Sequence, residues 1–208
     1  MSRALILVDL QPDFMPGGAL PVAEGDTIVE PIRKLMERDP FDLYVATQDW
    51  HPRNHISFAS RHPGHNPFDV IELYGHPQAL WPDHCVQGTP GAELHAGIPW
   101  TMVSAIIRKG TDADTDSYSG FHNNYDPHGE RPPTGLAGYL RERGVNDVVV
   151  CGLARDFCVK WTAEDAARVG FDTTVLWDLT RPVHATSDNA VRAELERAGV
   201  TIIDSDQL

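Results

Sequence analysis

Four side chains that could share one chemical step follow four apolar segments of the chain. Asp9 follows "ALILV", Asp49 ends "LYVATQD", Lys109 ends "SAIIRK", and Cys158 comes shortly after "VVVCGL". A carboxylate and a cation beside a thiol supply a proton acceptor and a compensating charge, which is the pattern of an activated nucleophile. We therefore predict that Cys158 is a nucleophile and that Asp9 and Lys109 assist it.

The surroundings of the two neighbouring cysteines in this region differ. Cys158 falls in the first turn of a helix predicted over 156–169, which Asp156 could cap. Free N–H groups and the helix dipole stabilise a thiolate there, so we expect a lowered pKa for Cys158. Cys151 lies inside an apolar strand segment and is predicted to be a core residue.

A second group of residues has the spacing of metal ligands. Asp49 and His51 are two residues apart at the end of an extended segment, so both side chains point to the same side. With His84 from a later loop they form a set of one carboxylate and two imidazoles, which suits a divalent transition metal with open positions. A His-rich polar surface loop is the alternative, and several residues compete as ligands, namely His55, His62, His65, His76, Glu72 and Cys85.

The elements that must position these residues alternate along the chain. Short apolar segments predict strands at 4–8, 43–46, 102–107, 148–151, 173–176 and 200–203, and helical spacing predicts helices at 26–38, 134–144, 156–169 and 186–198. Continuous apolar strands separated by helices imply a parallel sheet covered on both faces. We predict an α/β fold with a three-layer, doubly wound, mostly parallel six-stranded sheet, whose site lies beyond the carboxyl ends of the strands.

Two long stretches interrupt this alternation. The segments at about 49–100 and 110–133 are rich in Pro, Gly, His and Asn, and we expect them to be functional loops without regular structure. No repeat or linker divides the chain, so residues 1–208 are predicted to form a single domain.

Composition narrows the class of protein. The 208 residues carry 17 Lys and Arg against 30 Asp and Glu, a formal net charge of −13, which disfavours nucleic acid and anionic membranes as partners. Apolar runs are too short for a membrane helix, and no signal peptide is evident. Three cysteines cannot form a closed disulfide framework, and we expect a cytoplasmic protein. The sequence leaves open whether the chain forms a homo-oligomer.

Six motifs together carry a family resemblance. They are "ALILVDLQPDFMPGGALPV", "QDWHPRNHISFAS", "LWPDHCVQGTPGAEL", "IIRKG", "SYSGFHNN" and "VCGLARDFCVKWTAEDA". In this order and at these distances, the chain from about residue 3 to residue 204 resembles the nicotinamidases, pyridine-carboxamide hydrolases of the isochorismatase-like cysteine hydrolase superfamily.

The resemblance implies a role for each candidate residue. Cys158 becomes the nucleophile, Asp9 the general base and Lys109 the cation that supports both. Hydrolysis of nicotinamide to nicotinic acid and ammonia through a thioester is expected, with pyrazinamide as a further substrate. The metal ligands become Asp49, His51 and His84, which would hold one divalent ion, with zinc ahead of iron or manganese, that anchors the ring nitrogen. Activation of water by the metal is a chemically sound alternative role.

The resemblance also places the substrate pocket. Phe14 and Trp81 would flank the ring, and Tyr118 and Leu153 would be further substrate-binding residues. Leu153–Ala154 would be a cis peptide beside an oxyanion hole formed by the N–H groups of Ala154 and Cys158. Some relatives have a histidine before the nucleophile, where this chain has Phe157, so no role is assigned there. Whether His55 or Ser57 takes part in the metal site stays open.

Three rival functions remain at this level. A metal-free relative that hydrolyses an enol ether, another small amide or an N-carbamoyl compound would not need Asp49, His51 and His84 together. A non-haem iron oxygenase would use two histidines and a carboxylate but would leave Cys158 and Lys109 without a role. A catalytically silent metal-binding or scaffold protein is the third. Ammonia release from nicotinamide distinguishes them.

Overall fold

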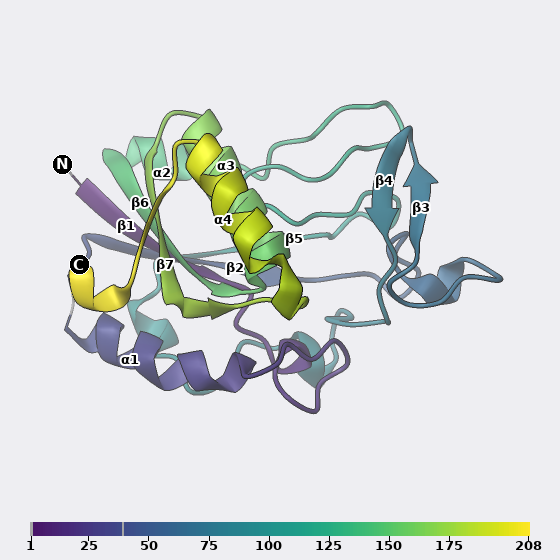
Figure 1. Ribbon diagram of the computed structural model, residues 1–208, viewed down its shortest axis with the longest axis horizontal. Coiled ribbons are helices and arrows are strands. Elements are labelled where there is room, and N and C mark those ends of the chain that lie inside the picture. Colours follow the sequence, from purple (N-terminus) through teal and green to yellow (C-terminus); the bar gives the residue numbers. More distant parts are fainter. Residues whose placement is uncertain (1, 39) are drawn as a thin grey trace.

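A six-stranded parallel sheet forms the centre of the molecule (Figure 1). The computed structural model describes residues 2–38 and 40–208. The strands, in spatial order, are β5 (Ala105–Lys109), β2 (Leu43–Asp49), β1 (Ser2–Val8), β6 (Val145–Leu153), β7 (Asp172–Arg181) and β8 (Thr201–Ile203). All five pairings between these neighbours are parallel. The predicted sheet is therefore confirmed.

Helices cover both faces of this sheet because its strands are apolar on both sides. Figure 1 shows α1 (Val29–Glu37) on one side, and α3 (Lys160–Arg168) and α4 (Asp188–Arg197) on the other. The buried side chains of β1 alternate accordingly: Leu5 and Leu7 pack in the core that includes α1, whereas Ile6 packs with α3, α4 and α2 (Leu136–Glu142). The result is the predicted three-layer architecture.

The order of the strands creates a switch point between β1 and β6. From β1 the chain adds β2 and β5 on one side, and it then adds β6, β7 and β8 on the other. The two central strands pack so closely that a Cβ atom at Gly152, whose φ is +118°, would lie 2.2 Å from the carbonyl oxygen of Val8. Ligands of open α/β sheets bind at the carboxyl end of such a switch point.

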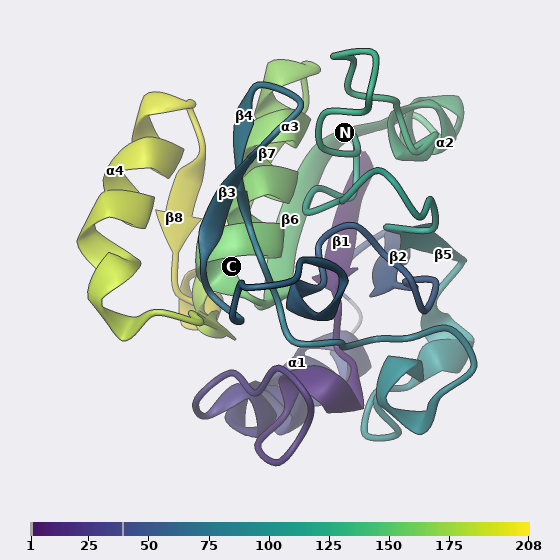
Figure 2. The ribbon, with the colours of Figure 1, turned by 90° about the vertical axis from the view of Figure 1, so that its right-hand side faces the viewer.

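The long loops contain more regular structure than the sequence indicated. Within 49–100, β3 (Val70–Leu73) and β4 (His76–Ala79) form an antiparallel hairpin, which crosses in front of α3 and β7 in Figure 2. Tyr74 and Gly75 form its two-residue turn, both with positive φ. That conformation favours Asn or Asp followed by Gly. Because this turn has a tyrosine at the first position, the sequence did not indicate a hairpin here. The segment 110–133, which the structure describes throughout, contains no helix or strand, as predicted.

Element boundaries shift by a few residues from those predicted. The third predicted strand, at 102–107, begins at Ala105 because Trp100–Met102 form a 3-10 turn. The first predicted helix opens with another 3-10 turn, Gly25–Ile28. Across the described residues, the helices are either too short or too polar to cross a bilayer.

Candidate active site

The ends of four neighbouring strands bring the predicted catalytic residues together. Asp49 and Lys109 end β2 and β5 and are direct partners in the register of that pair. Asp9 follows β1, and Cys158 follows β6 after one turn. The four side chains are buried, with Lys109 1% and Cys158 6% exposed. The structure thus places together all four side chains that the sequence singled out at strand ends.

Lys109 lies at the centre of this group. Its Nζ atom is 2.9 Å from Asp9 Oδ2 and 3.4 Å from Cys158 Sγ, forms a short ion pair with Asp49, and donates to the carbonyl of Ser117 at 3.1 Å. Burial opposes the charged form of Lys109, but the two carboxylates outweigh it and raise its pKa. One buried ammonium therefore serves two carboxylates and a thiol.

The backbone and a threonine fix the carboxylate of Asp9. Its φ of +46° lies in the left-handed region, which costs energy for a residue other than glycine. Thr47 accepts a hydrogen bond from the Asp9 amide at 3.2 Å and donates one to Asp9 Oδ1 at 2.6 Å. Burial raises the pKa of Asp9 to about 6, although Lys109 acts in the opposite direction. Asp9 is therefore a carboxylate at neutral pH with an increased affinity for a proton.

The environment of Cys158 differs from the prediction. Cys158 lies in a π-helical turn, Arg155–Val159, that precedes α3, and not in the first turn of an α-helix. Burial raises the pKa of the thiol well above its ordinary value, the charge of Lys109 lowers it and the charge of Asp9 raises it again. The expected lowering of the pKa is wrong because desolvation of the thiolate outweighs the nearby cation.

Two side chains of this turn bind it to the segment 177–184 at and after the end of β7. The guanidinium of Arg155 donates to the carbonyl oxygens of Trp177 and Thr180. Asp156 accepts hydrogen bonds from the amides of Val183 and His184 at 2.8 and 2.9 Å. The predicted helix cap at Asp156 is therefore wrong, since its carboxylate holds a neighbouring loop and the residue before the turn, Ala154, stands at the cap position.

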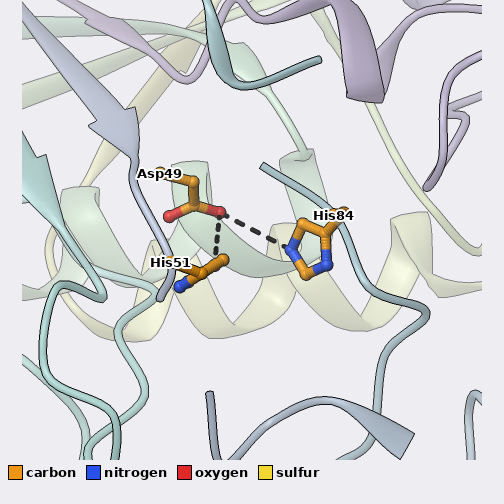
Figure 3. Close-up of side chains that lie close together, drawn as sticks. All are labelled: Asp49, His51 and His84. Atoms are coloured by element: carbon orange, nitrogen blue, oxygen red, sulfur yellow. Dashed lines mark ion pairs between the residues drawn. The ribbon is translucent and has the colours of Figure 1, made fainter. Parts of the chain in front are cut away.

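The second predicted group also converges. Figure 3 shows the rings of His51 and His84 turned toward the carboxylate of Asp49, with the Nε2 atoms 3.5 and 3.8 Å from Asp49 Oδ2. The Nδ1 atoms of the two rings contact the carbonyl oxygens of Gly110 and Pro82, at 2.9 and 2.7 Å. A carbonyl partner at Nδ1 leaves Nε2 as the coordinating atom, which is the usual arrangement around a metal-binding histidine. The three residues thus fit a divalent transition metal.

Electrostatics around this donor set also suit a cation. Burial works against the ionised form of Asp49, but Lys109 and His51 outweigh it and hold the pKa of that carboxyl well below its ordinary value. Burial and the charge of His51 lower the pKa of His84 to about 4. Asp49 is therefore an anion, and His84 is neutral, as a metal ligand must be.

Two further carboxylate-containing groups occur among the described residues. His51, His55 and Asp116 also offer mutually close ligand atoms, as do Asp9, Asp49 and Cys158. The latter group surrounds the ammonium of Lys109, which already supplies a cation there. Asp116 was not predicted, because its segment, "DADTDS", contains several carboxylates that the sequence cannot rank.

Of the residues that compete as metal ligands, His55 lies in a close ligand group with His51 and Asp116. The His55 Nδ1 atom is 2.8 Å from the Ser57 hydroxyl, and its ring packs against His51 with centroids 4.1 Å apart. The remaining competitors (His62, His65, His76, Glu72 and Cys85) belong to none of the three close ligand groups found in the described residues. Cys151 is fully buried in the core, as predicted.

A small pocket opens onto both groups. Asp49, His51, His84 and Cys158 share it with the predicted ring-binding residues Phe14, Trp81 and Tyr118, with Ala154, and with residues that the sequence did not indicate, among them Asp116, Phe157 and Val183. Leu153 is not part of the pocket lining in the described chain and packs in the core. The expected cis peptide between Leu153 and Ala154 is present.

Several known proteins resemble this chain over most of its length. The isochorismatase domain model matches residues 3–207. The nicotinamidase of Acinetobacter baylyi is 51% identical over 180 residues, which cover 86% of this chain and 81% of that protein. The structure of an Acinetobacter baumanii nicotinamidase and pyrazinamidase is 45% identical, with a TM-score of 0.92 over 100% of this chain and 98% of the other. A Pyrococcus horikoshii pyrazinamidase, solved in complex with zinc, is 39% identical, with a TM-score of 0.77 over 98% and 99% of the two chains. The chain therefore belongs to the isochorismatase family, where it groups with the nicotinamidases.

Proposed function

We propose that this protein hydrolyses nicotinamide to nicotinic acid and ammonia, with pyrazinamide as a second substrate. The observation that carries the proposal is that Cys158, in contact with Lys109 and through it with Asp9, shares one pocket with aromatic walls with the Asp49, His51 and His84 group. The first group suits attack on a carboxamide, and the aromatic walls suit a flat ring.

The protonation states of the catalytic residues define the first step. At neutral pH Asp9 is ionised and Cys158 is a thiol, because burial raises both pKa values but that of Asp9 only to about 6. Asp9 accepts the thiol proton while the sulfur attacks the carboxamide carbon. Lys109, 3.4 Å from the sulfur, compensates the negative charge that the sulfur gains.

The remaining steps regenerate the enzyme. We assign the oxyanion hole to the N–H groups of Ala154 and Cys158, two residues that line the pocket. Asp9 returns the proton to the nitrogen that leaves as ammonia, and a thioester remains on Cys158. Water, deprotonated by Asp9, then cleaves the thioester and releases nicotinic acid and the free thiol.

Asp49, His51 and His84 would hold the metal, and we propose zinc on the basis of the donor set and of the zinc in the Pyrococcus horikoshii relative. A bound cation there would supply a Lewis acid that fixes the ring nitrogen of the substrate. We also propose a cytoplasmic location, where the three free cysteines would stay reduced.

The proposal is tested by ammonia release from a panel of small carboxamides, with the metal content measured on the same sample. Nicotinamide and pyrazinamide should be hydrolysed, and Cys158→Ala should abolish the reaction. Cys151→Ala is the matched control, because this cysteine lies in the core of β6 and should leave activity intact. Absence of ammonia release by a metal-loaded wild-type sample would refute the proposal.

A further inference from the structure

A second cavity adjoins the substrate pocket. It is a groove of about 410 Å³ between the β3–β4 hairpin and helices α3 and α4. Phe68 and Val70 on the hairpin side are 52% and 66% exposed, which is unusual for large apolar side chains. Trp161 and Val191 line the groove on the helical side. The groove is thus an open, largely apolar space directly outside the site.

Three aromatic side chains separate the groove from the pocket. Trp81, Tyr118 and Phe157 border both cavities. Their rings meet edge to face, with the centroid of Phe157 4.7 Å from Trp81 and 5.5 Å from Tyr118, and those of Trp81 and Tyr118 6.2 Å apart. We refer to these three residues as the aromatic partition.

Hydrogen bonds hold two rings of the aromatic partition in place, but not the third. The Tyr118 hydroxyl accepts hydrogen bonds from Trp81 Nε1 at 3.3 Å and from Gln78 Nε2 at 3.0 Å, which fixes two of the three rings. Phe157 has no polar side-chain atom and is held by ring contacts and by its place in the chain. Removing its ring therefore opens the partition without leaving a buried polar group unpaired.

The charges that border the groove restrict what could bind there. Lys160 is the only Lys or Arg among the described residues that line it, and its Nζ atom is paired with Glu194 at 2.6 Å. A phosphate or a carboxylate would lack a free cation, whereas a neutral aromatic ring would contact Phe68, Val70 and Trp161. The groove therefore suits an uncharged ring attached to the carboxamide-bearing ring.

We propose that Phe157 determines specificity by closing the pocket toward this groove, which confines the enzyme to single-ring carboxamides. Once Phe157 is truncated, the groove accepts the second ring of a bicyclic carboxamide. The inference rests on the proposed amidase function. It assigns to Phe157 a steric role, and it assigns to the groove a ligand class that the reaction on nicotinamide does not use.

The test compares Phe157→Ala and Phe157→Leu with the wild type. The substrates are nicotinamide and two bicyclic probes that carry the ring nitrogen in the same relation to the carboxamide, quinoline-3-carboxamide and isoquinoline-4-carboxamide. We expect Phe157→Ala to lower kcat/KM for nicotinamide about tenfold, because the substrate loses an aromatic contact. The ratio of kcat/KM for at least one bicyclic probe to that for nicotinamide should rise at least 100-fold, with a smaller rise in Phe157→Leu.

A double variant tests whether the second ring enters the groove. Adding Val70→Asp to Phe157→Ala should remove most of the gain on the bicyclic probe, because a charge then lies in the apolar wall, and should leave the nicotinamide rate of the single variant within about twofold. Wild-type hydrolysis of nicotinamide tests the amidase function separately. The specificity role is overturned if the wild type hydrolyses both probes with the same kcat/KM as nicotinamide. It is also overturned if Phe157 variants that are folded and active on nicotinamide show no increase in relative kcat/KM for either probe. A gain that Val70→Asp does not reduce overturns the groove assignment.

Discussion

The turn that carries Cys158 should depend on Arg155 for both stability and rate. The Arg155 guanidinium donates to the carbonyl oxygens of Trp177 and Thr180 at 3.1 and 2.8 Å and to the Thr180 hydroxyl at 2.8 Å, and it lies 3.9 Å from the centroid of the Trp177 ring. It also pairs with Asp188, whose side chain is 40% exposed. We predict that Arg155→Met weakens this junction, because methionine keeps the ring contact but none of the hydrogen bonds.

The magnitude follows from these contacts. A hydrogen bond from a charged donor contributes about 1.5–3 kcal/mol, and the partly exposed ion pair contributes less than about 1 kcal/mol. The lower end of this range applies, because each carbonyl keeps a second hydrogen bond: Thr180 Oγ1 donates to the Trp177 carbonyl, and Arg181 Nη1 donates to the Thr180 carbonyl. Burial also opposes the charge of Arg155 and lowers its pKa, which reduces the loss. We expect Arg155→Met to lower the free energy of unfolding by about 3 kcal/mol, which lowers Tm by roughly 6–12 °C for a chain of this size.

Arg192→Met is the matched control. Arg192 also lies over the Trp177 ring, 4.4 Å from its centroid. A contact of this kind contributes about 0.5–1 kcal/mol, so Tm should fall by only about 1–4 °C. Thermal and urea unfolding of both variants, with kcat on nicotinamide, measure the difference. Arg155→Met should also lower kcat more than tenfold by displacing the thiol. Equal losses in the two variants would refute this account of the turn.

Three further predictions address the catalytic groups. Iodoacetamide should inactivate the enzyme through Cys158, slowly at pH 7 because burial raises the pKa of that thiol, and nicotinamide should protect it; equal labelling of the fully buried Cys85 and Cys151 would contradict this assignment. The pKa of Asp9, about 6, predicts that kcat/KM on nicotinamide falls about tenfold per pH unit below pH 6, as the base is protonated, whereas a fall that begins only near pH 4 would indicate another base. The wild type should prefer nicotinamide over benzamide about 10²-fold in kcat/KM, and His51→Ala should shrink this preference toward unity; equal losses on both would instead assign the metal to the shared carboxamide or to water.

Much of the architecture could be predicted because burial on both faces leaves a clear pattern. Apolar segments such as 4–8 and 148–151 gave the central strands, and parallel pairing then required their carboxyl ends to share one edge. That topology places Asp9 and Lys109 at the same edge of the sheet. The residue types indicated an activated nucleophile, but strand ends carry polar residues in many folds, and the specific role of each residue came from the resemblance to nicotinamidases.

Other features depend on tertiary contacts that have no local pattern. The left-handed backbone of Asp9 is supported by Thr47, which lies 38 residues away in the chain. The raised pKa of Cys158 reflects its burial, which its position at the start of a helical segment does not reveal. Asp116 reaches the pocket from a segment with several carboxylates that the sequence cannot rank, and Phe157 belongs to the motif around Cys158, but the sequence does not show that its ring faces the pocket. In each case the missing information is a distance between distant segments.

Lys109 contacts both groups of the site. It ends the edge strand β5, and two strand spacings, about 10 Å, separate that strand from β1, so only a long side chain can meet Asp9 and Cys158 from there. Its ammonium is shared with Asp49, one of the residues assigned to the metal. Asp9, Asp49 and Lys109 together carry a net charge of −1 when ionised, and such buried charges are tolerated only while they are paired. Lys109, to which we assign stabilisation of the thiolate, therefore also sets the charge available to a cation at Asp49, so the proposed nucleophile and the proposed metal site share one buried charge.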